Sequence, residues 1–357
     1  MRRFPSPARV PRAVSALALA ALLAAVAGCG RSRTPREVAW DALPNDAGLG
    51  MYEYVADLVK TASPRDAGTL GAARASRWIA QELKRMGLRP EADCWTETTP
   101  QGRKTFCNIY VDFPGTSGQT VLLVSHYDTK SGIPGFQGAN DGGSSVGILL
   151  GLAEHFVSHR LRLRHTVRLA FVDGEEAVGS YHLDSPPFDG LHGSSRLARH
   201  YEELWREARD RSPGRIPPPP LLACIVLDMV GDRNLRIDIP RNSSVWLARA
   251  AMRAAEERDD LPVVTLATSW TIDDHVPFIA RNFSAIDFID FEYGSAAGRH
   301  DYWHTPEDTL DKISARSLHR SASLALALLS RIEAGTEVPR ELLAHDPGSS
   351  PEEADAP

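Results

Sequence analysis

The sequence predicts a three-layer α/β sandwich around a mixed, mostly parallel sheet. Strand patterns alternate with helical patterns along the chain, the central strand candidates are apolar at nearly every position, and no internal repeat interrupts them. Such alternation is typical of parallel sheets covered by helices on both faces, which make their strands continuously apolar. With 357 residues, of which 43% are hydrophobic, the chain can build one large core.

The elements are expected in a fixed order. Two helical patterns, at 51–61 and 69–86, come first, and Gly87 is a natural stop for the second. Strand patterns follow at 90–96, 105–113, 119–126, 166–172, 221–230 and 284–290, and helical patterns at 144–158, 193–208, 243–257 and 315–333. The proline-rich run at 213–220 is expected to be a surface loop.

The first 29 residues are predicted to be an export signal. Several arginines precede an apolar stretch at 13–27, which is too short and too rich in alanine to span a membrane comfortably. The run VAGC at 26–29 resembles a bacterial lipoprotein signal with Cys29 as the lipidated first residue; an ordinary cleaved signal is the alternative. A single lipidated end anchors a protein without spanning the membrane. We therefore expect a protein anchored in a membrane and facing the periplasm or cell surface.

The remaining chain is expected to form a tether, one domain and a tail. Residues 30–47 are polar and assigned to the tether, 48–337 to a single domain, and 338–357, with many Pro, Glu and Asp residues, to a disordered tail. The formal net charge of -6, without a basic block after the first dozen residues, argues against nucleic-acid binding. We expect a monomer that contacts the membrane only through its lipid.

Three cysteines remain besides Cys29. Cys94 and Cys107 flank the turn-like run TPQGRK at 99–104 and could pair across a hairpin in an oxidising compartment; two free thiols are the alternative. Cys224 lies in an apolar run and is expected to be a buried core residue.

Acidic residues and histidines gather at the predicted carboxyl ends of the strands, where open α/β sheets place their functional sites. Histidine and carboxylate ligands suit zinc. The candidates are His126, Asp128, Asp141, Asp173, Glu175, Glu176, Asp228 and His304.

Taken alone, each candidate has an ordinary structural explanation. Asp141 could be a helix N-cap, and His304 could be a plain loop histidine. The pair Glu175 and Glu176 could lie on the solvated surface, although such pairs seldom follow a buried strand directly. Their joint occurrence in this order favours a metal-dependent enzyme. A serine hydrolase finds little support, because the glycines around Ser144 are misplaced for a nucleophile elbow.

The order of the motifs resembles the zinc aminopeptidase superfamily. The motifs are HYD (126–128), GANDGG (138–143), DGEEA (173–177), LDMVG (227–231), DDHVPF (273–278) and WHTPEDT (303–309). The resemblance covers roughly residues 70–335 and implies a mixed sheet between helices. It implies that Glu175 is the general base and that Asp128 orients His126. Two-metal members use five ligands, which fall here on His126, Asp141, Glu176, Asp228 and His304, with Asp141 bridging.

Several segments resemble glutaminyl-peptide cyclotransferases within that superfamily. They are TTPQGRKTFCNI (98–109), HYDTK (126–130), HGSSRLA (192–198), DDHVPF (273–278) and the Trp303–His304 pair. This resemblance implies one zinc, a proton shuttle at Glu175 and a pocket wall at Trp303, which read alone could be a core aromatic. The implied assignments are zinc ligands at Asp141, Glu176 and His304, catalytic carboxylates at Glu175, Asp228 and Asp273, and substrate binding by Trp303 and Asp128.

The chain departs from the animal cyclases at two places near the expected pocket. Asp287 stands where they have a histidine, and the segment 292–302 is longer. The predicted function is conversion of the N-terminal glutamine of peptides or proteins to pyroglutamate, with release of ammonia. A two-zinc aminopeptidase with a second metal on His126 and Asp228 is the alternative. A non-catalytic peptide-binding relative is a third hypothesis, disfavoured because the implied zinc ligands and the shuttle are intact.

Overall fold

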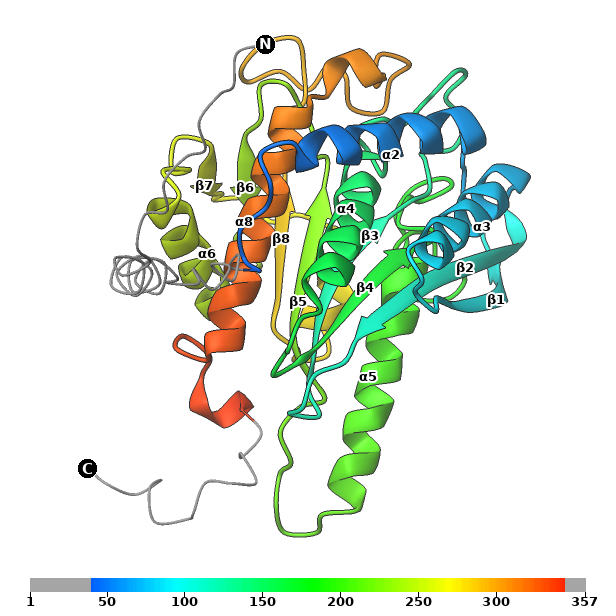
Figure 1. The fold of residues 1–357 in the computed structure, drawn as a ribbon. Coiled ribbons are helices and arrows are strands. Elements are labelled where there is room, and N and C mark those ends of the chain that lie inside the picture. Colours follow the sequence, from blue (N-terminus) through cyan, green and yellow to red (C-terminus); the bar gives the residue numbers. More distant parts are fainter. Residues whose placement is uncertain (1–39, 344–357) are drawn as a thin grey trace, which may run out of the picture. The chain divides into compact units, whose positions relative to one another are not determined.

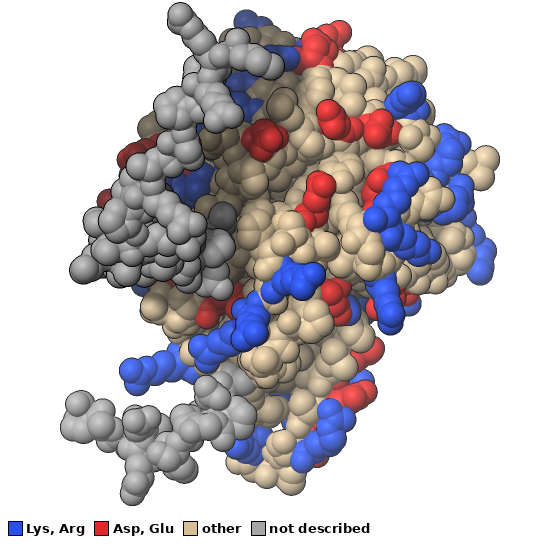
Figure 2. All heavy atoms as spheres, viewed as in Figure 1, with Lys and Arg blue, Asp and Glu red and all other residues tan. Residues whose placement is uncertain are grey.

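The computed structural model describes residues 40–343 (Figure 1). The export signal with Cys29, most of the predicted tether and most of the predicted tail lie outside the described residues. Within residues 40–343, no helix is long and apolar enough to cross a membrane. On the face drawn in Figure 2, basic and acidic side chains both occur, separated into small groups by neutral surface.

A mixed sheet forms the middle layer, which confirms the predicted fold class. In the described part of the chain its strand order is β1-β2-β4-β3-β5-β8-β6-β7. The central strands β4, β3, β5 and β8 are parallel to one another, whereas β1, β2 and β6 pair antiparallel to their inner neighbours. The strands are β1 (Glu91–Thr99), β2 (Gly102–Phe113), β3 (Thr120–His126), β4 (Thr166–Val172), β5 (Leu221–Asp228), β6 (Ile237–Ile239), β7 (Val264–Leu266) and β8 (Ala285–Ile289).

Helices cover the sheet from both sides. In Figure 1, α2, α4 and α8 lie in front of the central strands, whereas α5 lies behind them and extends below. The alternate residues of β3 explain both layers: Val121 and Leu123 enter the core under α2, α4 and α8, and Leu122 and Val124 enter the core under α5. The helices are α2 (Ala47–Ala62), α3 (Leu70–Arg85), α4 (Ser144–His159), α5 (His192–Asp210), α6 (Val245–Glu257), α7 (Val276–Ile279) and α8 (Ala315–Ala334).

The folded domain is longer at both ends than the predicted range 48–337. Trp40 packs against the core, and its carbonyl oxygen accepts a hydrogen bond from His155 Nε2 at 2.6 Å. Val338 is buried, and the Leu342 carbonyl accepts a hydrogen bond from Gln119 Nε2 at 2.7 Å. The described domain therefore extends beyond the predicted range at both ends, because apolar residues near each boundary pack against the core.

The two cysteines that flank the first hairpin are bonded. Cys94 and Cys107 stand directly opposite each other on β1 and β2 and form a disulfide. Cys224 is a buried free thiol in β5, as expected.

Candidate active site

The five predicted metal ligands come together at the carboxyl edge of the parallel strands. His126 ends β3, Asp228 ends β5, and Glu176 follows β4. Asp141 lies in the turn before α4, and His304 lies in the loop that leads to α8. The described residues contain two groups whose ligand atoms lie within 4.8 Å of one another, and Asp141 belongs to both. The first group is Asp141, Glu176 and His304, and the second is His126, Asp141 and Asp228.

The first group is partly open to solvent. His304 Nε2 lies 2.7 Å from Glu176 Oε1 and 3.3 Å from Asp141 Oδ2, and the His304 side chain is 22% exposed. Glu176 Oε2 is buried without a hydrogen-bond donor, although Lys130 Nζ lies 3.4 Å away. Buried carboxylate oxygens normally have a partner. One histidine and two carboxylates with an unused oxygen fit a zinc ion.

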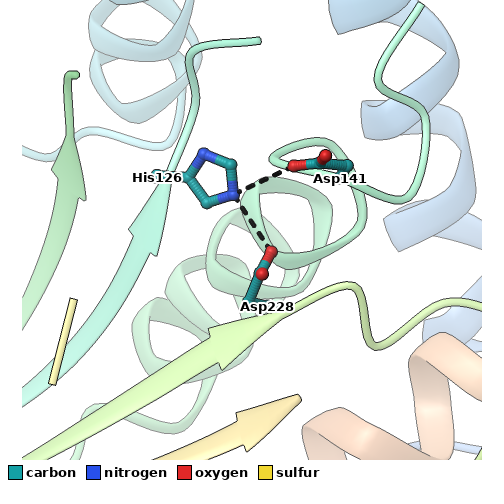
Figure 3. Close-up of side chains that lie close together, drawn as sticks. All are labelled: His126, Asp141 and Asp228. Atoms are coloured by element: carbon teal, nitrogen blue, oxygen red, sulfur yellow. Dashed lines mark hydrogen bonds and ion pairs between the residues drawn. The ribbon is translucent and has the colours of Figure 1, made fainter. Parts of the chain in front are cut away.

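The second group lies deeper. His126 is 1% exposed, and its Nε2 lies 3.0 Å from Asp228 Oδ1 and 3.4 Å from Asp141 Oδ1 (Figure 3). Burial alone would lower the pKa of His126, but the carboxylates of Asp228, Asp128 and Glu175 together outweigh burial and hold the pKa well above its usual value. The second group is thus held together by ion pairs of its own, although its residue types also suit a metal.

Asp128 supports both groups from beneath. Its carboxylate is fully buried and accepts hydrogen bonds from the backbone amides of Glu175 and Glu176, both at 3.1 Å. His126 Nδ1 lies 3.6 Å away, beyond a good hydrogen bond. The assignment of Asp128 to substrate binding is therefore corrected, because its side chain is fully buried beneath the loop that carries the two glutamates.

A small cavity of about 290 Å³, including its open mouth, lies over the first group. Trp303 is 39% exposed at this cavity, stacks on the His304 ring at 4.3 Å and meets the Phe291 ring edge-on. The predicted residues Glu175, Asp228 and Asp273 all line the same cavity. Sequence reasoning missed other lining residues, which are Tyr181, Met229, Ile272, Ile289 and Phe291.

Burial tunes the carboxylates of this cavity. Desolvation and the neighbouring Glu176 raise the pKa of Glu175 well above its usual value. Desolvation and Asp141 raise the pKa of Glu176 to about 7. Desolvation and Asp287 raise the pKa of Asp273 well above its usual value. A carboxyl group with a raised pKa can exchange protons with a substrate at neutral pH.

Two groups that sequence reasoning did not identify hold the turn with Asp141. The Asp308 carboxylate accepts hydrogen bonds from the backbone amides of Asn140 at 2.8 Å and Asp141 at 3.1 Å. The fully buried Arg65 donates to the carbonyl oxygens of Tyr127, at 2.6 Å, and Gly138, at 2.8 Å. The departure at Asp287 concerns a fully buried residue of β8 behind Asp273 and not a residue of the cavity lining.

Comparisons with known proteins point to one group of enzymes. The model of peptidase family M28 matches residues 108–329. The glutaminyl-peptide cyclotransferase of Drosophila melanogaster is 26% identical over 301 residues, which cover 77% of this chain and 79% of the fly protein. The crystal structure of an Acidobacteriales bacterium glutaminyl cyclase is 31% identical, with a TM-score of 0.71, and covers 82% of this chain and 97% of its own. A Zn-dependent exopeptidase from Parabacteroides distasonis, 24% identical with a TM-score of 0.65, shares the fold over 81% of this chain and 99% of its own.

Proposed function

This chain belongs to peptidase family M28, and on that premise we propose that it is a zinc-dependent glutaminyl-peptide cyclotransferase. The reaction converts the N-terminal glutamine of a peptide to pyroglutamate and releases ammonia. One observation carries the proposal: Glu175 lines a small cavity together with Asp141, Glu176 and His304, and Trp303 forms a flat wall of it. The names of the cyclase relatives from a fly and from an Acidobacteriales bacterium support it.

Asp141, Glu176 and His304 would hold the zinc ion, which when bound polarises the side-chain amide oxygen of the substrate as a Lewis acid. The α-amine and the side-chain amide belong to the same residue, so the enzyme has to hold a bent conformer. Trp303 offers an apolar face against which the glutamine side chain can fold.

Glu175 moves the proton in this scheme. It takes a proton from the α-amine as the bond between the amine nitrogen and the side-chain amide carbon forms. It returns that proton to the amide nitrogen as the carbon–nitrogen bond breaks, and ammonia leaves. Asp228 and Asp273 line the same cavity, where their side chains can form hydrogen bonds with the amine and with the leaving nitrogen.

A two-zinc aminopeptidase is the second candidate function. The observation that favours it is the second group, in which His126, Asp141 and Asp228 offer ligand atoms within 4.8 Å of one another. With two metals, Glu175 would deprotonate a water molecule, and the first residue of a peptide would be released by hydrolysis.

Mass spectrometry of two short peptides separates these functions. The purified protein is incubated with a peptide that begins with glutamine and with a matched peptide that begins with leucine. We expect loss of ammonia from the first peptide and no change in the second. Release of the first residue from the leucine peptide would replace the cyclase by the aminopeptidase.

We further propose that the protein is exported and anchored through a lipid on Cys29, with peptide or protein N-termini in the periplasm or at the cell surface as substrates. The lipoprotein-like run at 26–29 and the arginines before it support this proposal. Replacement of Cys29 by alanine should move the protein from the membrane fraction to the soluble fraction; unchanged membrane association would contradict it.

A further inference from the structure

Tyr181 makes a direct contact with the proposed proton shuttle. Its hydroxyl donates a hydrogen bond to Glu175 Oε1 at 2.7 Å. The tyrosine lines the same cavity and is 36% exposed at its mouth. Burial beside the Glu175 carboxylate raises the pKa of Tyr181 well above its usual value, so the hydroxyl keeps the proton that it donates.

The loop that carries Tyr181 is fixed at its base. The Asp189 carboxylate accepts hydrogen bonds from the backbone amides of Val178 at 2.7 Å and Gly179 at 2.9 Å. It also accepts one from Gln101 Nε2 at 3.1 Å, which ties the loop to the turn between β1 and β2. His182 and Asp189 pair through two backbone hydrogen bonds of 3.0 Å. Tyr181 lies between these anchored residues, so the loop holds it in one position.

The tyrosine ring has a slot of its own. A Cβ atom on Gly190, which has a φ of +90°, would lie only 2.4 Å from Tyr181 Cδ1. Only glycine combines this backbone conformation with the space that the ring needs. On the other side, Lys130 Nζ lies 5.6 Å from the ring centroid and donates to the Ala177 carbonyl oxygen at 2.7 Å. Gly190 and Lys130 thus flank the partly exposed ring and set its direction.

We propose that Tyr181 is a positioning residue that holds one oxygen of Glu175 and so presents the other oxygen to the substrate nitrogen. A strong hydrogen bond to one oxygen stops the carboxylate from rotating before the substrate binds. The entropy of that rotation then does not have to be lost in the reaction step. This inference rests on the proton-transfer role proposed for Glu175, which is common to the cyclase and the aminopeptidase.

The test is the Tyr181→Phe variant of the full chain, which keeps the ring in its slot and removes only the hydroxyl. We expect kcat to fall by about tenfold to a hundredfold, the effect of losing one hydrogen bond to a charged group. KM, zinc content and melting temperature should stay at the wild-type values. The matched control is Tyr201→Phe, a buried tyrosine of α5 that does not line the cavity, which should leave kcat unchanged.

A double-variant comparison shows whether the hydroxyl acts through Glu175. In the Glu175→Gln background, Tyr181→Phe should cause no further loss, because both changes remove the same function. The inference is overturned if Tyr181→Phe keeps the wild-type kcat, or if KM rises or zinc is lost to the same extent as kcat falls. It is also overturned if Tyr181→Phe lowers kcat by the same factor in the Glu175→Gln background. Each comparison uses the peptide that the wild-type enzyme turns over. If that is the leucine peptide, the cyclase proposal fails, but the same variants still test the role of Tyr181.

Discussion

The two candidate metal groups share Asp141 but differ in their surroundings. In the first, Glu176 and His304 face the cavity, and the histidine is partly exposed. In the second, His126 is almost fully buried and already lies 3.0 Å from Asp228. Catalytic metal sites keep a position open for substrate, whereas closed sites support structure. The first group therefore has the surroundings of a catalytic zinc site, whereas in the second group His126 is buried behind Asp141 and Asp228, which line the cavity.

Loss of a ligand from the first group should have the largest effect. Glu176→Ala removes a carboxylate that lies 2.7 Å from His304 Nε2. We expect zinc to be lost and turnover to fall by about 10³-fold or more, because a Lewis acid contributes several kcal/mol to the transition state. Elemental analysis and peptide kinetics check this. Glu307→Ala, an exposed glutamate in the same loop as His304, is the control that should keep its zinc; full zinc in Glu176→Ala would refute the ligand assignment.

Glu175→Gln separates proton transfer from metal binding at the same edge of the sheet. The amide keeps the size of the side chain but cannot accept the proton, so turnover should fall by about 10²–10⁴-fold. Zinc content and melting temperature should remain at the wild-type values, because Glu175 belongs to neither metal group. Near-normal kcat in steady-state kinetics would show that another group moves the proton.

The pH dependence of zinc binding should follow the first group. Without metal, the carboxylates of Asp141 and Glu176 raise the pKa of His304 to about 10 against the opposing effect of burial, and the pKa of Glu176 is about 7. Zinc displaces both protons, so affinity must rise with pH. The rise should be about a hundredfold per pH unit below pH 7, where both protons are bound, and about tenfold per unit above it. Competition with a chelator across this range measures it; a flat profile would mean that other ligands bind the ion.

The smallest effect is expected in the second group. His126→Asn should keep one zinc and lower kcat/KM by less than about tenfold, the lower end of what a supporting residue contributes. The control is His165→Asn, a buried histidine next to Ser117 on the opposite edge of the sheet, which reports the cost of losing a buried ring. Loss of zinc and of activity in His126→Asn alone would assign a second metal to this group and favour the aminopeptidase.

The fold was largely predictable because the apolar residues of its strands follow the pattern in which the strands are buried. The residues of β5 are buried on both faces, and the alternate residues of β3 enter opposite cores, as continuous apolar runs require. Periodicity could not find β6, β7 or α7, which have three, three and four residues. Nor could it show that Trp40 and Val338 pack on the domain, because single apolar residues in polar segments carry no period.

The candidate ligands were predictable for a different reason, since they stand next to strand ends in short motifs. The contacts that support them were not. Asp128 was identified from its motif, but its hydrogen bonds to the glutamate loop were not. Arg65, which reaches the turn with Asp141 from the segment before α3, and Tyr181, which reaches Glu175 from an irregular loop, were not identified at all. Each of these contacts depends on how loops meet in three dimensions, and no spacing along the chain encodes it.

The most direct test of the contrast between the two groups is native mass spectrometry of the zinc-saturated protein. We predict one zinc ion per chain in the wild-type protein and in His126→Asn, and none in Glu176→Ala. Two ions in the wild-type protein, with one lost in His126→Asn, would contradict this account and make the second group a metal site in its own right.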